Sequence, residues 1–264
     1  MMRIAIFNQK GGVGKTTTTL NLGAALKRAG MPPLMIDLDP QGHLSSIRGN
    51  TPGEANHSLF AFYQDLSSLD SLKIAWDEIG HLIPSHQQLI KVDSIFGKGP
   101  AILNKLKSGI DAMESDETQS PVLIDCCPYI GVLALNAIFA CDRLIIPVST
   151  DYLSLQAADH ITRTLQVLEP VLKRRVERRY LLTRFDRRRR MSDDVRNKLR
   201  ERYASEVLET VISENVTVAE SPSLNRDVFR HNPNSSGAHD YQALLGELIE
   251  RGDIPSPAQT TPRP

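Results

Sequence analysis

The feature that most constrains the fold of this chain is a glycine-rich loop at residues 8–17, Asn-Gln-Lys-Gly-Gly-Val-Gly-Lys-Thr-Thr. It follows an apolar, β-branched run at 3–7, which is typical of a buried strand. It precedes residues 16–29, whose apolar spacing predicts a helix that Gly30 ends. Glycines allow backbone N–H groups to surround phosphate oxygens, and the N-terminus of a helix attracts anions. With a second strand at 34–37, the pattern predicts a phosphate-binding β-α-β unit.

The same alternation of apolar runs and helical spacing continues along the chain. It predicts an α/β fold in which helices flank one doubly wound, mostly parallel sheet. Further strands are expected at 81–84, 122–125, 144–148, 180–183 and 207–212, and further helices at 101–113, 152–168, 191–203 and 236–251.

Domain boundaries follow from the same pattern. Residues 1–252 are expected to form a single domain around the glycine-rich loop, and 253–264, with four prolines, a disordered tail. Residues 42–80 are the least regular stretch and are expected to contain short helices. Residues 112–120 are expected to form an exposed acidic loop, and Pro170 is expected to end the helix before it.

Composition excludes several classes of protein. The chain has 264 residues, with 31 Lys and Arg against 31 Asp and Glu, and only three cysteines. Three cysteines do not form the disulfide framework of a secreted domain, so we expect an intracellular, reducing compartment. No apolar run approaches the roughly 20 residues of a membrane span, and the N-terminus does not resemble a secretory signal. We therefore expect a cytoplasmic protein.

Residues of the glycine-rich loop have distinct expected roles at a nucleotide. Lys15 can reach the β- and γ-phosphates, and the Thr16 hydroxyl can ligate Mg²⁺. The loop departs from the ordinary Walker A form, because Gln9 stands where a glycine is usual and Lys10 is an additional lysine. Besides these lysines and Thr16, the expected phosphate contacts are Gly11, Gly12, Val13, Gly14 and Thr17.

This K-G-G-x-G-K-T pattern resembles that of the deviant Walker A ATPases of the ParA/MinD family, and the resemblance extends along nearly the whole chain. Residues 34–42, which end in Asp-Leu-Asp-Pro-Gln-Gly, are similar to the second motif of the family. Residues 122–128 resemble its Walker B strand, although Cys127 stands where a proline is usual. Residues 211–223 and 234–241 are similar to late segments of the ParA branch.

The resemblance implies a site that hydrolyses ATP with Mg²⁺. Asp125 is expected to hold the metal through a water, and Asp37 to support the metal shell. Asp39 is expected to contact the metal site and to position or activate the attacking water. Together with Thr16 these carboxylates form the expected metal site, although Asp37 could instead cap its strand. Cys126 stands where fast P-loop ATPases often carry a glutamate base, so we expect slow hydrolysis that limits the lifetime of a dimer.

The resemblance also implies a homodimer that ATP holds together. Lys10 is expected to reach the nucleotide of the partner subunit, and Lys10 and Lys15 are both expected to act in catalysis. Adenine contacts are expected at Thr183 and Ser213, although Ser213-Glu214 replaces the Pro-Arg usual in this branch. The chain lacks an Asn-Lys-x-Asp guanine motif, which favours ATP.

Basic residues gather in one segment although the net charge is zero. Residues 171–202 contain 14 Lys and Arg against 5 Asp and Glu, a difference of +9. Such a surface can bind phosphates without reading a base sequence. An ordinary solvated loop is the alternative. The resemblance favours nonspecific binding of double-stranded DNA by the ATP dimer, although Thr217 replaces one arginine usual there. The expected DNA contacts are Arg163, Arg184, Arg187, Arg188, Arg189, Arg190, Arg196 and Arg200, of which 187–190 should lie in an exposed loop.

Three alternative functions are weaker. A MinD-like membrane-associated positioning ATPase requires a basic amphipathic C-terminal helix, whereas residues 246–251 are short and acidic. A reductase similar to the nitrogenase iron protein requires cysteines that hold a cluster between subunits. Cys126 and Cys127 are adjacent and are expected to be small buried residues. The late ParA-like segments disfavour an ATP-dependent ligase or synthase of related fold.

We therefore predict a cytoplasmic, nucleoid-associated switch with no membrane partner and no sequence-specific DNA-binding domain before the glycine-rich loop. It is expected to position or segregate a cargo on DNA, and a ParB-like or cargo-linked adaptor protein is expected to stimulate hydrolysis. The cargo is a chromosome or plasmid partition complex, a chemoreceptor cluster or a carboxysome, and the sequence does not distinguish among them.

Overall fold

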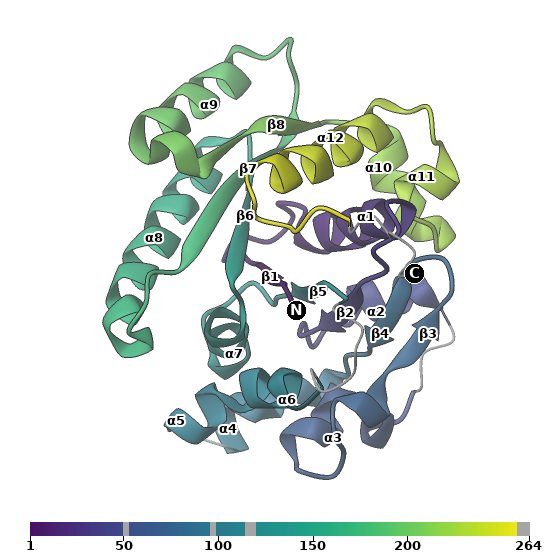
Figure 1. The fold of residues 1–264 in the computed structure, drawn as a ribbon. Helices are drawn as coiled ribbons and strands as arrows, with labels where there is room; N and C mark the ends of the chain where they lie inside the picture. The colour runs from purple at the N-terminus through teal and green to yellow at the C-terminus, as the bar shows by residue number, and fades with distance from the viewer. Residues whose placement is uncertain (50–52, 96–98, 114–119, 258–264) are drawn as a thin grey trace, which may run out of the picture.

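A computed structural model describes residues 1–49, 53–95, 99–113 and 120–257 of the chain. Within these residues, eight strands form one sheet in the order β3-β4-β2-β5-β1-β6-β7-β8 (Figure 1). Neighbouring strands are parallel except for β3 and β4, which pair antiparallel at one edge. The predicted α/β fold with a mostly parallel sheet is confirmed. The strands are β1 (Arg3–Ile6), β2 (Leu34–Asp37), β3 (Ile74–Trp76), β4 (Gly80–Ile83), β5 (Val122–Asp125), β6 (Arg143–Ser149), β7 (Glu177–Phe185) and β8 (Val207–Ser213).

Helices cover both faces of the sheet (Figure 1). One face packs against α1 (Lys15–Arg28), α2 (His43–Arg48), α10 (Val216–Glu220), α11 (Val228–His231) and α12 (Ser236–Glu250). The other face packs against α3 (Leu59–Tyr63), α4 (Val92–Ile95), α5 (Pro100–Leu103), α6 (Lys105–Met113), α7 (Val132–Ala140), α8 (Tyr152–Leu172) and α9 (Arg190–Tyr203). Short 3₁₀ helices lie at Ala55–His57, Asp70–Leu72, Gln87–Lys91, Ala204–Glu206 and Ser221–Leu224.

The central strands are buried because helices cover both of their faces. Alternate residues of a strand point to opposite faces, so Ile36 and Ile124 belong to the core on the α7 side. Met35 and Leu123 belong to the core on the α1 side. All residues of β1, β2 and β5 are buried, which explains their continuous apolar sequences.

The helices differ from the sequence prediction at several places, among them the short helices α4, α10 and α11, which were not predicted. Helix α8 continues through Pro170 to Leu172, because a proline in the last turn removes one backbone bond without ending the helix. Lys173, with φ at 52°, then ends it. The predicted helix 101–113 is interrupted at Asn104. Helix α7 is absent from the predicted elements because it is apolar on nearly every side and lacks amphipathic spacing.

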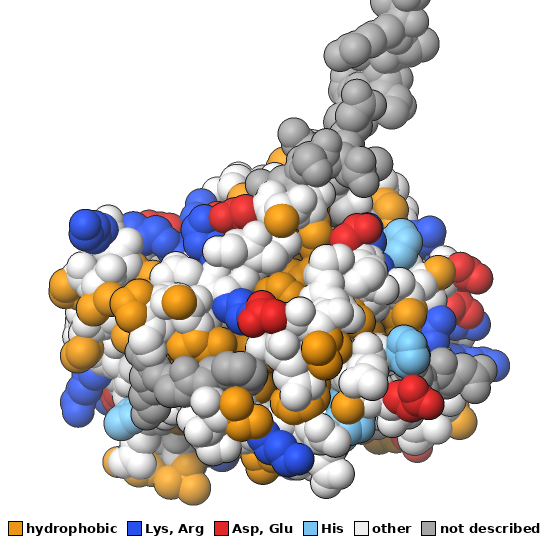
Figure 2. All heavy atoms as spheres, turned by 90° about the horizontal axis from the view of Figure 1, so that it is seen from below, with side chains coloured by type: hydrophobic (Ala, Val, Ile, Leu, Met, Phe, Trp, Pro, Cys, Tyr) orange, Lys and Arg blue, Asp and Glu red, His pale blue; other side chains and the backbone are white. Residues whose placement is uncertain are grey.

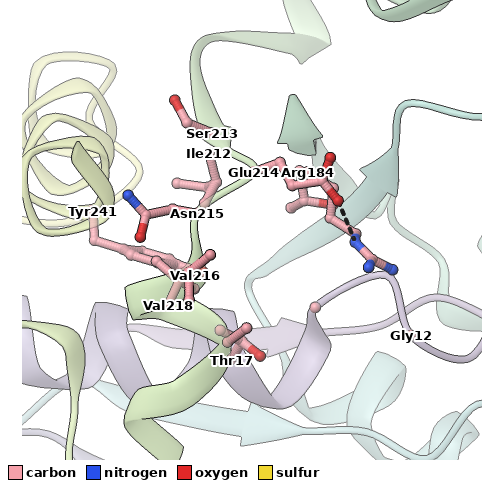
Figure 3. A pocket seen from close by; sticks show the side chains of 13 residues that line it. Gly12, Thr17, Arg184, Ile212, Ser213, Glu214, Asn215, Val216, Val218 and Tyr241 are labelled. Carbon is pink, nitrogen blue, oxygen red and sulfur yellow. Dashed lines mark ion pairs between the residues drawn. The ribbon is translucent and has the colours of Figure 1, made fainter. Parts of the chain in front are cut away.

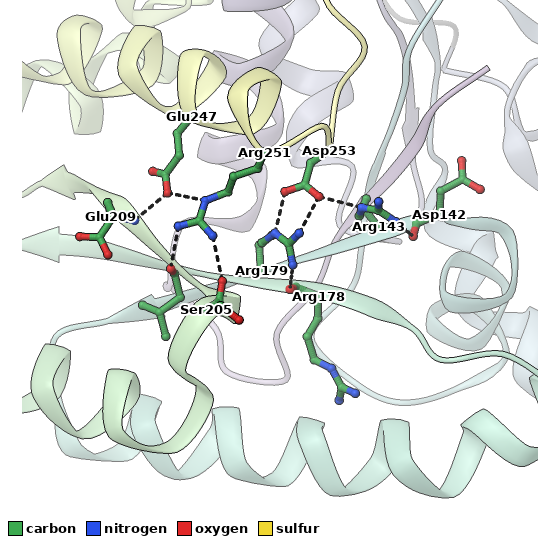
Figure 4. A network of polar contacts seen from close by, with 10 residues as sticks. Asp142, Arg143, Arg178, Arg179, Ser205, Glu209, Glu247, Arg251 and Asp253 are labelled. Carbon is green, nitrogen blue, oxygen red and sulfur yellow. Dashed lines mark hydrogen bonds and ion pairs between the residues drawn. The ribbon is translucent and has the colours of Figure 1, made fainter.

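The C-terminal tail begins later than predicted. Ile254 belongs to the core, and Asp253 is only 1% exposed. The Asp253 carboxylate accepts hydrogen bonds from Arg143 Nε (2.8 Å) and Arg179 Nε (2.6 Å), on the adjacent strands β6 and β7 (Figure 4). The predicted boundary is therefore wrong at these two residues, because two arginines and the core hold them. Residues 258–264, and most of the predicted acidic loop 112–120, lie outside the described residues.

The face at the bottom of Figure 1, over α3 and α6, is the one that Figure 2 shows. Hydrophobic side chains gather on this face, and the charged side chains between them are scattered. Among the side chains that the structure describes, this face therefore shows no broad basic surface that would fit nucleic acid. Of the helices in the described ranges, none is both long and apolar enough to cross a membrane.

Loops with predicted chemistry lie together at the carboxyl edge of the sheet. The last residues of β1 and β2 are both in register with Asp125, the last residue of β5. Strand β1 leads to the glycine-rich loop, and β7 and β8 end near Thr183 and Ser213. Open α/β sheets bind ligands at this edge, where strand ends and helix N-termini meet.

Candidate nucleotide site

The glycine-rich loop between β1 and α1 has the shape of a phosphate site. Gly12 (φ 72°) and Gly14 (φ 90°) have left-handed backbone conformations, which residues with a Cβ rarely adopt. The buried Asn8 side chain supports the loop, because its Nδ2 donates to a carbonyl of β6 (2.7 Å) and its Oδ1 accepts from the Lys10 N–H (2.9 Å). Among the described residues no side chain caps α1, so the N–H groups of its first turn can bind an anion.

Lys15, Thr16 and Asp125 meet at the start of α1. Thr16 Oγ1 donates to Asp125 Oδ2 (2.7 Å), and Thr19 Oγ1 donates to Asp125 Oδ1 (3.2 Å). Lys15 Nζ donates to the Lys10 carbonyl (3.1 Å). A hydroxyl and a carboxylate are oxygen ligands of the kind that Mg²⁺ prefers, and a lysine beside them can neutralise phosphate charge. These residues fit a magnesium nucleotide, with Thr16 and Asp125 toward the metal and Lys15 toward the phosphates.

Burial perturbs the ionisable groups of this site. Burial raises the pKa of Asp125, the charge of Asp37 raises it further, and the hydrogen bond from Thr16 lowers it. Burial also raises the pKa of Asp37, and it lowers the pKa of Lys15. A divalent cation would stabilise the charged form of neighbouring buried carboxylates, which supports the fit of these residues to a metal.

The two aspartates after β2 have different environments. Asp37 Oδ2 accepts from the Ser45 N–H (2.8 Å) and hydroxyl (2.6 Å), and its Oδ1 accepts from the Asp39 N–H (3.1 Å). Asp37 thus organises the loop, and its support of the metal stays a prediction. Asp39 Oδ1 accepts from the Gln41 N–H (2.9 Å), and the Asp39 carbonyl accepts from Ser85 Oγ (2.5 Å). Within the described residues Asp39 Oδ2 has no hydrogen-bond partner, which leaves it able to hold a water.

Lys10 is bound within its own chain. Its Nζ donates to Asp151 Oδ1 (2.5 Å) and to Ser154 Oγ (2.9 Å) at the start of α8. Burial would raise the pKa of Asp151, but hydrogen bonds from Lys10, Ser149 and Ser154 hold it well below its usual range. The expected contact of Lys10 with the nucleotide of a partner stays a prediction, and it requires this ion pair to open.

A pocket of about 400 Å³ lies beside the glycine-rich loop (Figure 3). The loop and the first turn of α1 form its phosphate side, and the segment from β8 to α12 forms the opposite wall. Its size and its apolar wall fit a purine base. Its lining includes Gly12, Gly14 and Thr17 on the first side and Ile212, Val216, Val218 and Tyr241 on the second.

The structure brings both expected adenine residues to this pocket. Thr183 and Ser213 line it, at the ends of β7 and β8. Thr183 Oγ1 donates to the Val13 carbonyl (2.8 Å), which joins β7 to the glycine-rich loop. The Ser213 N–H donates to Asp240 Oδ2 on α12 (2.8 Å), so this backbone group is already satisfied within the chain. Their contacts with a base stay a prediction.

Glu214 forms ion pairs at the rim of the pocket. Its carboxylate lies 3.9 Å from Arg184 Nε, as the dashed line in Figure 3 shows, and 3.3 Å from Arg189 Nη1. The departure from the usual Pro-Arg therefore places an anion beside two of the arginines expected to bind DNA.

Residues 187–190 are exposed as predicted, and although Arg190 is the first residue of α9, 187–189 form the loop after β7. Asp186 holds its turn, because it accepts from Arg188 N–H (3.0 Å) and Nε (2.9 Å). The hydrogen bonds from Arg188 lower the pKa of Asp186 to about 2. Arg189 Nε lies 3.2 Å from the same carboxylate. The turn therefore neutralises part of its own charge.

The other expected DNA contacts are dispersed. Arg196 pairs with Asp193 (2.6 Å), and Arg200 pairs with a glutamate on β8. Arg163 is exposed on α8, a different element from the loop. In the part of the chain that the structure describes, no ion pair involves Arg163, Arg187 or Arg190. These three side chains can contact a phosphate without first leaving a partner.

The prediction of one basic surface over residues 171–202 is wrong. Strand β7 runs through this segment, and its nine residues separate the two ends by roughly 30 Å. Arg178, near the start of β7, is buried and pairs with Glu169 (2.7 Å), and Arg179 pairs with Asp253. Only residues 184–190, between the end of β7 and the first residue of α9, lie at the nucleotide edge, whereas Arg200 pairs with Glu209 near the start of β8.

The cysteines are buried, as predicted. Burial raises the pKa of Cys127 to about 12, and it raises the pKa of Cys126 as well, so both thiols are poor nucleophiles and poor ligands. The described residues also contain no group of three or more His, Cys, Asp or Glu side chains arranged to hold a metal ion. The expected magnesium set of Thr16, Asp37, Asp39 and Asp125 stays a prediction.

Sequence reasoning missed three residues of the site. Asn8 supports the glycine-rich loop, Asp151 binds Lys10, and Tyr241 forms part of the pocket wall. Asn8 could have been found, because a polar residue directly after a buried strand stands next to the phosphate loop. No local signal identifies Asp151 or Tyr241, which tertiary packing brings to the loop from distant segments.

Comparisons with known proteins agree with this geometry. The model of a family described as an AAA domain matches residues 1–178. The chromosome partitioning protein ParA of Caulobacter vibrioides is 32% identical over 94% of each chain. The chromosome-partitioning ATPase Soj of Thermus thermophilus is 35% identical over 94% of this chain and 96% of its own. Among solved structures, cobyrinic acid a,c-diamide synthase from Mycobacterium smegmatis with bound ATP analog and magnesium is 27% identical, with a TM-score of 0.82 over 96% of each chain.

Sequence identity above 30% over nearly the full chain connects this protein with the partitioning ATPases, whereas its likeness to the synthase is weaker in sequence and strong in fold. This agrees with the prediction made from the motifs. The chain belongs to the ParA/Soj family of partitioning ATPases.

Proposed function

We propose that this protein is an ATP-driven switch that binds DNA nonspecifically as a dimer and releases it after slow hydrolysis. One observation supports the proposal above the others. The phosphate loop, Asp39 and the loop 187–190 all lie at the same edge of the sheet, so that one bound nucleotide can affect hydrolysis, dimer contacts and DNA contacts.

Slow hydrolysis follows from the groups around the phosphates. Asp39 can orient a water, but Cys126 occupies the position after Asp125 and is buried with a raised pKa. The site therefore lacks a second carboxylate that could take a proton from the water at that position. A slow intrinsic rate would leave control to an adaptor protein.

Dimer formation would use Lys10. In the structure Lys10 is bound by Asp151 and Ser154, and a partner's triphosphate would compete for the same ammonium group. The proposed dimer therefore forms only when the triphosphate of the partner's ATP attracts the Lys10 ammonium group more strongly than Asp151 does. This makes dimerisation depend on the nucleotide.

The names of the relatives suggest the cargo. They are a chromosome partitioning protein and a chromosome-partitioning ATPase, so we propose a chromosome or plasmid complex as the first cargo to test, with a ParB-like adaptor. The proposal places the protein in the cytoplasm on the nucleoid.

Binding to a DNA duplex of random sequence tests the proposal directly. Fluorescence anisotropy would be measured with ATP, with ADP and without nucleotide over a series of salt concentrations. We expect binding only with ATP, and an affinity that falls steeply with salt because basic side chains displace counterions. Equal binding in all three states, or no binding with ATP, would contradict the proposal.

A further inference from the structure

The two halves of the nucleotide pocket come from distant parts of the chain, and one buried side chain joins them. Asn21 lies on α1, one turn beyond the phosphate side, and is 0% exposed. Its Nδ2 donates to the Thr17 carbonyl (2.9 Å), and Thr17 lines the pocket. Its Oδ1 accepts from the Val228 N–H (2.8 Å), 207 residues further along the chain.

The bond to Val228 completes the start of helix α11. The first N–H groups of a helix have no partner within it. Asp227 accepts from the Phe229 N–H (2.9 Å) and the Arg230 N–H (3.0 Å), which leaves the Val228 N–H to Asn21. Because this N–H is buried, removal of Asn21 would leave it unpaired. The position of α11 therefore depends on α1.

Packing continues from α11 to the pocket wall. A Cβ on Gly237 in α12 would lie 2.1 Å from Val218 and 3.5 Å from Val228, so the three residues are in close contact. Val218 itself lines the pocket. A shift of α11 would thus move a residue that faces the base.

A second connection runs through Tyr241 on α12. Tyr241 lines the pocket, where Figure 3 shows its side chain extending from the helix. Burial raises the pKa of Tyr241 to about 12, and the neighbouring side chains of Thr18 and Asn21 oppose this shift. Asn21 therefore bonds directly to α11, while Tyr241 belongs to the same core cluster as the residues of α1.

We propose that Asn21 is a positioning residue that sets the place of the base wall relative to the phosphate loop, and thereby the selection of ATP by its base. The inference rests on the proposed binding of ATP. Asn21 acts through Thr17 and Val228 and does not line the pocket. Its loss would disturb the base contacts and leave Lys15 in place.

The substitution Asn21→Leu tests this, because leucine has a similar size but forms neither hydrogen bond. Dissociation constants of magnesium-ATP and magnesium-GTP would be measured by calorimetry, together with KM and kcat for ATP. We expect the ATP dissociation constant and KM to rise about tenfold, while kcat stays unchanged. The GTP dissociation constant should change much less, so that the preference for ATP falls.

Asn136→Leu is the matched control. Asn136 on α7 is equally buried, donates to the carbonyls of Val132 (2.9 Å) and Ile102 (2.9 Å), and accepts from the Leu106 N–H (3.0 Å). It forms the same kinds of bond on the opposite face of the sheet. Its loss should lower the melting temperature and leave the preference for ATP unchanged.

Three outcomes would overturn the inference: an unchanged ATP affinity in Asn21→Leu, an equal loss of ATP and GTP affinity, or the same loss of preference in Asn136→Leu. If Asn21→Leu does not fold, Asn21→Ala decides, since it removes the bonds to Thr17 and Val228 without introducing a branched apolar side chain. It should lower the preference for ATP, and an unchanged preference would overturn the inference. Failure of the wild-type protein to bind ATP would instead contradict the proposed function.

Discussion

Three aspartates of the site differ in what their surroundings leave them free to do. Asp125 is paired with Thr16, and both oxygens of Asp37 accept bonds from the loop that follows β2. Asp39 keeps one oxygen without a bond among the described residues. As aspartates, all three have the same intrinsic chemistry. Their different hydrogen bonds determine which carboxylate oxygens remain available to a metal or a water.

Asp39→Asn should reduce ATP hydrolysis by about 100-fold, because an amide cannot accept a proton from the attacking water. Asparagine keeps the size of the side chain and an oxygen for the Gln41 N–H, so ATP binding should change by less than about twofold. Single-turnover hydrolysis and calorimetry would measure the two effects. The exposed Asp194→Asn serves as the control. Wild-type turnover in Asp39→Asn would remove Asp39 from the mechanism.

Lys10→Ala should abolish ATP-dependent dimerisation, and Asp151→Ala should permit it at a lower ATP concentration. The reason is that Asp151 holds Lys10 within its own chain through a 2.5 Å ion pair. Light scattering during an ATP titration measures both. A normal dimer of Lys10→Ala would exclude a role in the partner's site, and an unchanged ATP requirement in Asp151→Ala would show that the ion pair does not restrain Lys10.

At the scale of elements, the end of strand β7 connects the nucleotide pocket with the basic loop. Arg184 has a left-handed backbone (φ 53°), and its carbonyl accepts from Thr150 Oγ1 (2.9 Å). The register between β7 and β8 shifts here, so that Glu214 from β8 reaches the arginines of β7. Acidic residues of neighbouring elements thus reduce the positive charge that the sequence segment suggests.

Glu214→Gln should strengthen DNA binding and make its salt dependence steeper, because it removes the carboxylate that pairs with Arg184 and Arg189. Each additional phosphate contact changes the slope of log K against log salt by about one. Anisotropy in the presence of ATP measures the slope. Arg187→Gln removes a positive charge instead, and it should make the slope of log K against log salt less steep. An unchanged slope in both variants would place the DNA contacts elsewhere.

At the scale of the molecule, the end of the chain is fixed to the edge of the sheet opposite the nucleotide site. Asp253 bonds to Arg143 and Arg179 on two adjacent strands (Figure 4). Arg251 nearby donates to the Ser205 carbonyl (2.8 Å), and it pairs with Glu247 on the last helix (2.8 Å). The contacts connect α12 with the central sheet, and α12 also forms part of the nucleotide pocket.

Asp253→Ala should therefore destabilise the whole fold. It leaves two partly buried arginines without their carboxylate, which costs about 3 kcal/mol of unfolding free energy. For a chain of this size that lowers the melting temperature by roughly 5–10 °C. Calorimetry measures the shift, and the exposed Asp194→Ala is a control that should change it little. A wild-type melting temperature would show that the core around Ile254 holds the end of the chain by itself.

Much of this architecture follows from local sequence. The glycine-rich loop between an apolar strand and a helix defines the phosphate site, and the apolar runs ending in Asp37 and Asp125 place both carboxylates at the same edge of a parallel sheet. Helix α7 could not be predicted in this way, because a helix that is buried on nearly every side shows no amphipathic period in its sequence. Strand β3 could not be predicted either, because three residues are too few to show an alternating apolar pattern.

The sequence by itself determined the fold class, the phosphate loop and the family, because these depend on residues adjacent in the chain. Only the tertiary structure decided how the charges are distributed. Strand β7 separates the basic segment into two distant ends, and Glu214 and Asp186 neutralise arginines that the sequence counts as free. The tertiary structure also decided that Asn21 connects the wall of the pocket with the phosphate loop. Interactions between groups far apart in the chain depend on distances that only folding sets.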